Sequence, residues 1–170
     1  MKTSGYTINI IPPAGIYDKF DEIIKKLAGK YGTFKFAPHI TVLGQASDSK
    51  ETAIKLMEQV TSNQKPFTVT LNKVGFQDFF FRALYVLAEK TAPLAELHRK
   101  AKMIFNKEAA PYMPHLSLLY GDFAPEIKEK IIQEIGSEQP TTFIVSSLHL
   151  FRTEGESNEW YSVAKFPFKD

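Results

Sequence analysis

The chain has 170 residues, of which 44% are hydrophobic and 24% are charged, a length and composition typical of one globular domain that buries its own core. It contains no cysteine, which excludes disulfides, thiolate nucleophiles and thiolate metal sites and fits a reducing compartment. The net charge is +2 and the basic residues form no block, which argues against a nucleic acid as an obligate partner. We expect residues 1–170 to form a single domain.

The sequence carries no sign of membrane insertion or export. No apolar run approaches the roughly 20 residues that span a bilayer. Residues 1–5 lead into a strand pattern and lack the apolar stretch and cleavage site of a signal peptide. We therefore expect a cytoplasmic protein without a membrane partner.

The first half of the chain alternates strand patterns with amphipathic helices. Phe20, Ile24 and Leu27 share one helical face, and Gln77-Asp78 is typical of a tight turn between two strands. The expected strands are 6–11, 36–44, 67–76 and 79–88, and the expected helices are 16–31 and 48–60.

The second half repeats this rhythm. Pro93 and Pro125 mark two helix starts and Gly136 marks a helix end. The expected helices are 91–105 and 125–136, and the expected strands are 114–120, 143–152 and 160–168. Four helices mixed with about seven strands predict an α+β fold, and the matching order of elements in the two halves predicts an approximate internal duplication.

Two segments share a pattern in which a proline and a histidine precede alternating hydroxyl and apolar residues. They are Pro38-His39-Ile40-Thr41-Val42-Leu43 and Pro114-His115-Leu116-Ser117-Leu118-Leu119. Residues i and i+2 of a strand share a face, so each strand presents an imidazole beside a hydroxyl. The intervening apolar residues point to the opposite face and anchor the strand in a core.

Two imidazoles and two hydroxyls in one cleft suit hydrolysis of a phosphodiester without a metal. A neutral histidine takes a proton from the attacking water, and a protonated histidine gives one to the leaving oxygen. Both forms are accessible because the histidine pKa lies near neutrality. The hydroxyls stabilise the phosphoryl oxygens by donating hydrogen bonds.

Two other interpretations of the motifs are weaker. A single histidine two residues before a threonine is more often structural than catalytic, but two matching copies reverse that preference. A zinc site needs more ligands than two histidines, and no acidic residue accompanies either motif.

With these motifs the sequence resembles the 2H phosphoesterase superfamily, whose mark is a pair of His-x-Thr/Ser motifs. Within it, the resemblance is strongest to the cyclic nucleotide phosphodiesterases of plants and yeast that act on ADP-ribose 1″,2″-cyclic phosphate. It rests on the segment from Pro111 to Tyr120, on the Phe79-Phe80-Phe81 run, on the opening strand that ends in proline, and on the stretch from Arg152-Thr153 to Trp160. These features keep the same order over nearly the whole chain.

The resemblance implies a bilobal fold, in which two antiparallel sheets with flanking helices surround a central cleft. It implies that His39 and His115 are the acid–base pair and that Thr41 and Ser117 bind the phosphate. The remaining implied positions are Tyr120 as a substrate contact, Phe81 in the nucleotide pocket, and Asn9 where the plant enzymes carry a stacking tryptophan. Strict alternation places Tyr120 on the face opposite His115, so its role requires a bend near Gly121.

The expected reaction is hydrolysis of ADP-ribose 1″,2″-cyclic phosphate or of a nucleoside 2′,3′-cyclic phosphate to a phosphomonoester, without metal or cofactor. We favour His115 as the base and His39 as the acid, although the similarity of the motifs leaves the order open. The expected partner is a small nucleotide, and we expect a monomer. The alternatives are an RNA-end processing enzyme with the same motifs and a nucleotide-binding module without catalysis.

Five other residues have simpler interpretations. His149 lies in an apolar strand and is expected to be partly buried and structural, whereas His98 lies among charged residues and is expected to be solvated. Trp160 is expected in the core or at the rim of the cleft. Lys35 and Arg82 are candidates for positive charge near the cleft, although such residues are mostly solvated.

Overall fold

A computed structural model describes residues 1–108 and 111–168. In this part of the chain the fold contains four α-helices, eight β-strands and two short 3₁₀ helices. The strands are β1 (Tyr6–Ile10), β2 (Ile40–Ser47), β3 (Phe67–Gly75), β4 (Leu84–Ala88), β5 (His115–Leu119), β6 (Glu138–Val145), β7 (Ser147–Arg152) and β8 (Tyr161–Pro167). The helices are α1 (Ala14–Tyr31), α2 (Lys50–Thr61), α3 (Ala92–Ile104), α4 (Pro125–Ile135), η1 (Phe80–Arg82) and η2 (Ser157–Glu159). The predicted α+β class is confirmed.

Local sequence features mark the start or the end of each α-helix. The Ser49 hydroxyl accepts a hydrogen bond from the Thr52 amide and caps α2. A proline occupies the first turn of both α3 and α4, where a missing amide hydrogen costs nothing. Gly32 ends α1 with a φ of 66°, a left-handed conformation that glycine adopts without strain.

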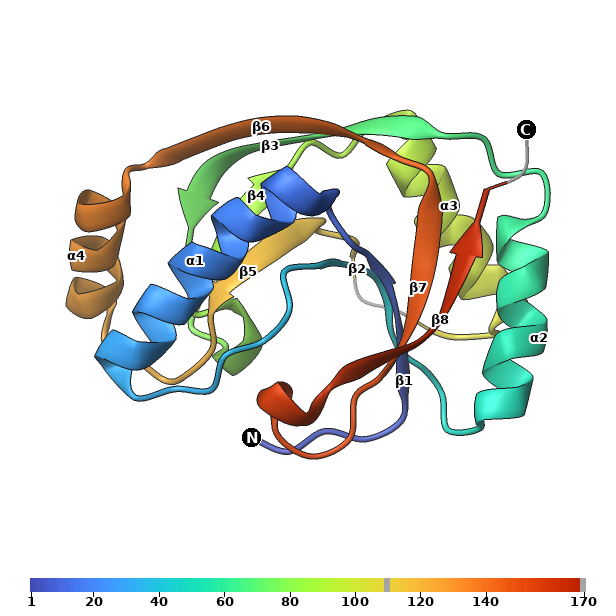
Figure 1. Cartoon of the computed structure of the whole chain (residues 1–170), viewed down its shortest axis with the longest axis horizontal. Coiled ribbons are helices and arrows are strands. Elements are labelled where there is room, and N and C mark those ends of the chain that lie inside the picture. Colours follow the sequence, from blue (N-terminus) through green and yellow to red (C-terminus); the bar gives the residue numbers. More distant parts are fainter. Residues whose placement is uncertain (109–110, 169–170) are drawn as a thin grey trace.

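The strands form one antiparallel sheet in the order β6-β3-β4-β5-β2-β1-β7-β8 (Figure 1). The family resemblance implies two sheets, and in the structure they are joined into one because Ile40 of β2 pairs with Leu116 of β5. Each half of the sheet contains four strands, with a motif strand innermost. The join is a contact between distant segments, which local patterns do not encode.

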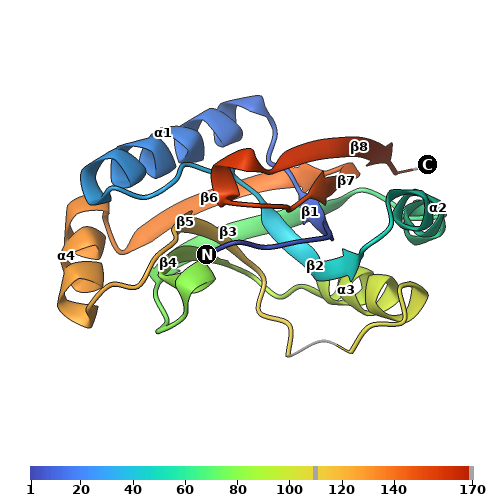
Figure 2. The same cartoon turned by 90° about the horizontal axis from the view of Figure 1, so that it is seen from below.

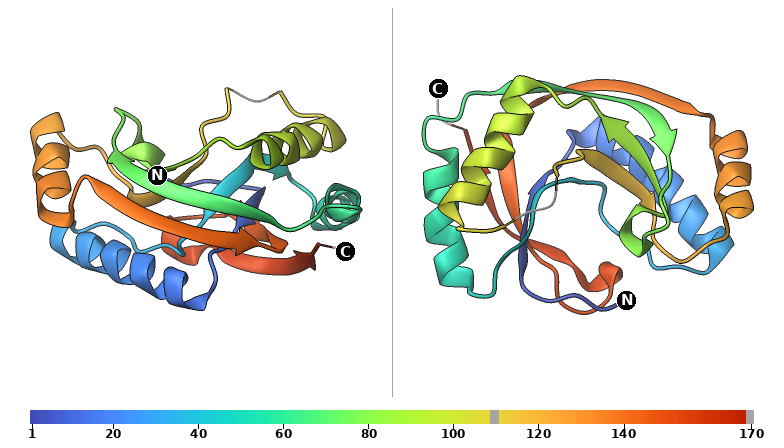
Figure 3. Two further views of the ribbon diagram at one scale, coloured as in Figure 1. Left: turned by 90° about the horizontal axis from the view of Figure 1, so that it is seen from above. Right: turned by 180° about the vertical axis from the view of Figure 1, so that it is seen from behind.

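The helices cover the two ends of the sheet. Helix α1 contacts β5, whereas α2 and α3 contact each other and β2. Figure 2 shows α1 and α4 at one end of the molecule and α2 and α3 at the other, and Figure 3 shows the same separation from two further sides. None of the helices in the described ranges is long and apolar enough to cross a bilayer.

The buried apolar residues of β2 and β5 determine which face of each strand carries the histidine and hydroxyl side chains. Ile40 and Val42 of β2 are buried, as are Leu116 and Leu118 of β5. Each such side chain stabilises the fold by about 1.5–3 kcal/mol relative to an exposed one. A one-residue slip would move all four out of the core, so the burial of these residues sets the orientation of the intervening histidine and hydroxyl side chains.

The predicted hairpin turn at Gln77-Asp78 is wrong. The connection between β3 and β4 is a longer loop that contains η1. The Gln77 amide donates to the Arg82 carbonyl at 2.9 Å, which brings the two ends of the loop together. Within the loop, the Arg82 amide donates to the Phe79 carbonyl at 2.8 Å. The phenylalanine run therefore lies in a loop rather than in a strand.

The predicted strand 143–152 is two strands. Burial changes phase between them, because Phe143 and Val145 are buried in β6 whereas Leu148 and Leu150 are buried in β7. Consequently β6 pairs with β3 and β7 pairs with β1. The alternation of buried and exposed side chains along a strand is therefore interrupted at residues 146–147.

Candidate active site

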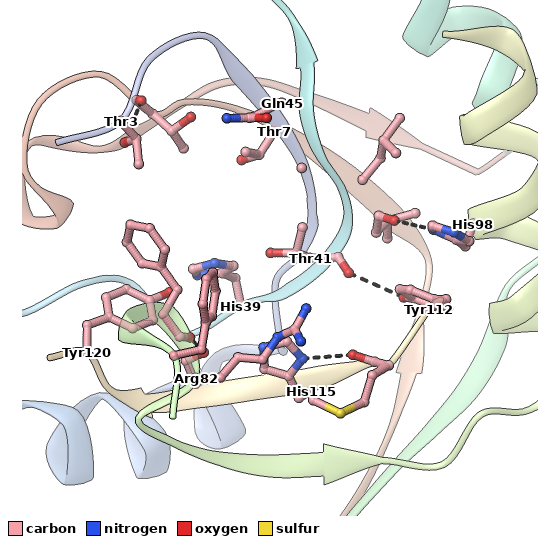
Figure 4. A pocket seen from close by; sticks show the side chains of 18 of the residues that line it. Thr3, Thr7, His39, Thr41, Gln45, Arg82, His98, Tyr112, His115 and Tyr120 are labelled. Carbon is pink, nitrogen blue, oxygen red and sulfur yellow. Dashed lines mark hydrogen bonds between the residues drawn. The ribbon is translucent and has the colours of Figure 1, made fainter. Parts of the chain in front are cut away.

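A cavity of about 500 Å³ lies where the two motif strands meet. This volume is within the range of small-molecule sites. Every site residue predicted from the sequence lines it: His39, Thr41, Phe81, His115, Ser117 and Tyr120. Figure 4 shows the His39 and His115 rings at this cavity, approached from the two motif strands.

Both imidazoles are oriented by the same local hydrogen bond. His39 Nδ1 lies 2.7 Å from the carbonyl oxygen of Ala37, and His115 Nδ1 lies 2.8 Å from that of Met113. Because a carbonyl only accepts, Nδ1 carries the hydrogen in both rings. In the neutral imidazole Nε2 is then an unprotonated base.

The proline of each motif helps to build this hydrogen bond. Ala37 and Met113 each precede a proline, which disfavours the helical region for the residue before it. The carbonyl of this residue is the one that each histidine ring contacts. The Pro-His pair is therefore part of the mechanism that orients the imidazole.

Burial favours the neutral form of both histidines. It lowers the His39 pKa, against a smaller raising effect of the Ala37 carbonyl. Burial is also the main cause that lowers the His115 pKa to about 4, against a smaller raising effect of the Met113 carbonyl and with smaller lowering effects of Arg82 and His39. A phosphate anion bound beside a histidine has the opposite effect and raises the pKa of that histidine.

The hydroxyl of Ser117 already has a hydrogen-bond partner within the protein. Ser117 is buried and its Oγ donates to the Phe81 carbonyl at 3.0 Å. Thr41, at the equivalent position of the other motif, is only half-buried. Ser117 therefore has to rotate before it can donate to a ligand.

The aromatic residues gather at one side of the cavity. Tyr120 stacks on Phe36 with ring centroids 3.8 Å apart and meets Phe81 edge-on at 5.2 Å. Trp160, which also lines the cavity, lies 6.0 Å from the Phe81 ring. These rings form an apolar wall against which a nucleobase can pack.

Tyr120 reaches the cavity because the chain leaves the strand. Strand β5 ends at Leu119, and Gly121 follows with a φ of 146°, which is a conformation that glycine favours. Burial raises the Tyr120 pKa, against a smaller lowering effect of the Ser117 hydroxyl. Its phenol is thus a neutral hydrogen-bond donor near pH 7.

The prediction that His98 is solvated is wrong. Its Nδ1 lies 2.7 Å from the Val42 carbonyl, and its ring stacks on Tyr112 with centroids 4.1 Å apart. The Tyr112 hydroxyl donates to the Thr41 carbonyl at 3.3 Å (Figure 4). This pair supports the strand that carries Thr41, and nothing in the local sequence around His98 signals it.

Two further expectations concern residues outside the motifs. His149 is half-buried as predicted, with Nδ1 3.2 Å from the Ser162 hydroxyl. Asn9 is buried opposite Thr41, and its Nδ2 donates to the Thr7 hydroxyl at 3.1 Å. Thr7 lines the cavity beside it, so this wall carries a small polar side chain.

The two candidate positively charged residues lie in different environments. Lys35 is exposed and forms an ion pair with Asp21 at 2.8 Å. Arg82 lines the cavity. In the sequence Arg82 directly follows the phenylalanine run, and this is the only feature of the sequence that indicates a place in the cavity for it.

Comparison with known proteins identifies the family. Residues 12–157 match the model of the 2′-5′ RNA ligase superfamily. A protein of Arabidopsis thaliana named cyclic phosphodiesterase is 29% identical over 172 residues, which cover 96% of this chain and 95% of that protein. A 2′,3′-cyclic-nucleotide 3′-phosphodiesterase of Phaeosphaeria nodorum is 29% identical over 148 residues, which cover 77% of this chain and 76% of that protein.

Solved structures support the fold. The protein TT0787 of Thermus thermophilus superposes with a TM-score of 0.70 at 14% identity, covering 99% of this chain and 98% of that one. LigT of E. coli, in complex with 3′-AMP, superposes with a TM-score of 0.67 at 15% identity, covering 98% and 99%. The chain therefore belongs to the 2′-5′ RNA ligase superfamily, and the resemblance to two-histidine phosphoesterases that its paired motifs indicated is confirmed.

Proposed function

We propose that the protein hydrolyses a cyclic phosphate on a ribose to a phosphomonoester, with His39 and His115 as the acid–base pair and without a metal. One observation carries this proposal. Two imidazoles, one directly before β2 and one at the start of β5, line one cavity, and each has Nδ1 bonded to a carbonyl so that Nε2 is the free base. Two proton-transfer groups are what a hydrolytic displacement at phosphorus requires.

The displacement consumes one water molecule and regenerates both histidines. His115 Nε2 takes a proton from the water as the water oxygen bonds to phosphorus. The bond from phosphorus to one ribose oxygen breaks, and His39 gives its proton to that oxygen. The product carries a phosphate monoester on one ribose hydroxyl and a free hydroxyl on its neighbour, and proton exchange with solvent restores both imidazoles.

The remaining predicted site residues act on the phosphate and the nucleoside. The Thr41 and Ser117 hydroxyls donate to the non-bridging oxygens, where charge accumulates in the transition state. Tyr120 and Phe81 contact the nucleoside. Because one chain supplies every residue of this set, we propose that the monomer is active.

The substrate we favour is ADP-ribose 1″,2″-cyclic phosphate or a nucleoside 2′,3′-cyclic phosphate. The names of the Arabidopsis and Phaeosphaeria relatives support a cyclic phosphodiester, and the cavity of about 500 Å³ suits a nucleotide. The family name favours a second candidate, which is processing of RNA ends. A net charge of +2 provides little attraction for a long RNA backbone.

A panel of substrates in the presence of a strong chelator tests the proposal. It contains ADP-ribose 1″,2″-cyclic phosphate, the four nucleoside 2′,3′-cyclic phosphates, 3′,5′-cyclic AMP and an RNA that ends in a cyclic phosphate. We expect turnover of the small ribose cyclic phosphates and a weak dependence on salt. Turnover that needs an added divalent ion would overturn the mechanism, and a preference for RNA with a steep salt dependence would favour RNA processing.

A further inference from the structure

Arg82 lies outside both motifs and places a positive charge at the cavity. Figure 4 shows the Arg82 side chain next to the His115 ring, with its guanidinium on the side of that ring toward Thr41. Its charge lowers the His115 pKa, which places the guanidinium within electrostatic reach of that imidazole. The residue is half-buried.

The guanidinium is held in place by the loop before it. Arg82 Nη1 donates to Gln77 Oε1 at 3.1 Å, and the guanidinium lies 5.4 Å from the Phe79 ring. The loop is in turn anchored to α4, because Nζ of the buried Lys128 donates to the Gln77 carbonyl at 2.9 Å. The position of Arg82 is therefore set before any ligand arrives.

The partners of Arg82 leave its charge uncompensated. Gln77 is neutral, and within the described ranges no carboxylate lies within ion-pair distance of Arg82. The cavity also contains Glu108, but its exposed carboxylate pairs with Lys102 at 3.5 Å. A half-buried guanidinium without a counter-ion is a favourable site for an anion, and its planar array of donors matches phosphate oxygens.

We propose that Arg82 binds a non-bridging oxygen of the scissile phosphate, with Gln77 as the residue that positions it; this inference rests on the proposed function. The scissile phosphate is preferred to a more distant phosphate of the substrate because Arg82 adjoins His115, which the proposed mechanism places next to the reacting phosphorus. Charge on the phosphoryl oxygens grows in the transition state, so Arg82 contributes to the rate as well as to binding.

Binding of inorganic phosphate, measured by calorimetry at low salt, tests the site without any turnover. We expect Arg82→Ala to weaken binding roughly 10- to 100-fold, as loss of a charge-assisted hydrogen bond does. Arg82→Lys keeps the charge and is expected to lie between Arg82→Ala and wild type. Arg99→Ala is the matched control, because Arg99 is exposed on α3, pairs with Glu96 and lies outside the cavity lining.

Gln77→Glu separates charge from structure. It keeps an acceptor for Arg82, gives up the weak hydrogen bond from Gln77 Nε2 to Met113 Sδ, and supplies a carboxylate that competes with phosphate, so we expect weaker phosphate binding by a protein that stays folded. If Arg82 only supports the loop, Gln77→Glu strengthens that support and phosphate binding stays as in wild type. Equal phosphate affinity in wild type, Arg82→Ala and Gln77→Glu would overturn the inference.

Two substrates locate the phosphate that Arg82 contacts. A nucleoside 2′,3′-cyclic phosphate has only the scissile phosphate, whereas ADP-ribose 1″,2″-cyclic phosphate also has a pyrophosphate. We expect Arg82→Ala to reduce kcat/KM by the same factor on both, and a loss confined to the second would overturn the assignment to the scissile phosphate. If wild type turns over neither substrate while Arg82→Ala still loses phosphate binding, the proposed function fails and the anion site stands.

Discussion

The two motifs share one local geometry and have different surroundings. Each histidine is oriented by the carbonyl two residues before it. His39 is only 8% exposed, and its ring is flanked by Phe36 and Phe151. His115 is more accessible, packs against Tyr85 and lies beside Arg82.

This difference bears on which histidine is the base and which is the acid in the proposed mechanism. The general base has to be neutral when the substrate is bound, and the general acid has to be protonated. Burial opposes a positive charge on both rings, and Arg82 opposes it further on His115, so we expect a bound phosphate to protonate His39 first. The comparison therefore favours His115 as the base and His39 as the acid.

The largest expected effect comes from removing either imidazole. His39→Ala and His115→Ala are each expected to lower kcat by about 100- to 10,000-fold, because each removes one proton transfer. The double variant is expected to lose less than the product of the two factors, since the groups act on one displacement. Near-normal turnover by either folded single variant would mean that the motifs are structural.

The hydroxyl groups of Thr41 and Ser117 are expected to differ in their effect on the rate. Thr41→Val and Ser117→Ala each remove a donor to the phosphoryl oxygens, which typically costs about 100-fold or more in kcat. Ser117 first has to give up its bond to the Phe81 carbonyl, so we expect the smaller loss for Ser117→Ala. Steady-state kinetics on one cyclic nucleotide measures both, and a larger loss for Ser117→Ala would contradict the asymmetry.

The buried imidazoles are also expected to make stability depend on pH. The His115 pKa falls from its ordinary 6.5 to about 4 on folding, so the unfolded chain binds the proton more readily between these values. Stability is then lost as pH falls from about 6.5 to about 4, by up to about 3 kcal/mol for this residue. Urea unfolding at pH 7 and pH 4.5 measures the loss, and His115→Gln is expected to reduce it.

The smallest effect is expected at the pair that supports the first motif. Tyr112→Phe removes the hydrogen bond to the Thr41 carbonyl and leaves the stack on His98. We expect a stability loss of about 1 kcal/mol and a reduction in kcat of less than tenfold. A loss as large as that of His39→Ala would show that Tyr112 takes part in the chemistry.

The parts of this fold that local rules control were predictable. Proline starts and a glycine end marked the two helices of the second half, and alternation placed His39 with Thr41 and His115 with Ser117. The β2–β5 contact was not predictable, because pairing between Ile40 and Leu116 depends on the packing of the whole sheet. The division between β6 and β7 is visible in the sequence only as a change of phase near residue 146.

The same limit applies to the site. The paired motifs and the family resemblance they carry identified six residues of the cavity lining, because each motif repeats a pattern whose chemistry is recognisable. His98, Gln77 and Arg82 act through contacts with segments that local patterns do not connect. His98 meets Val42 across the fold, and Gln77 holds Arg82 through a loop that the turn rules misassigned.

The central claim is that two neutral imidazoles with free Nε2 atoms become an acid–base pair around a phosphate. Nitrogen-15 NMR of the histidine rings across pH, without and with inorganic phosphate, measures this directly. We predict that His39 and His115 are both neutral Nδ1–H tautomers in the free protein at pH 7 and that phosphate raises the His39 pKa more than the His115 pKa. An Nε2–H tautomer for either ring, or phosphate binding that shifts neither pKa, would contradict the account.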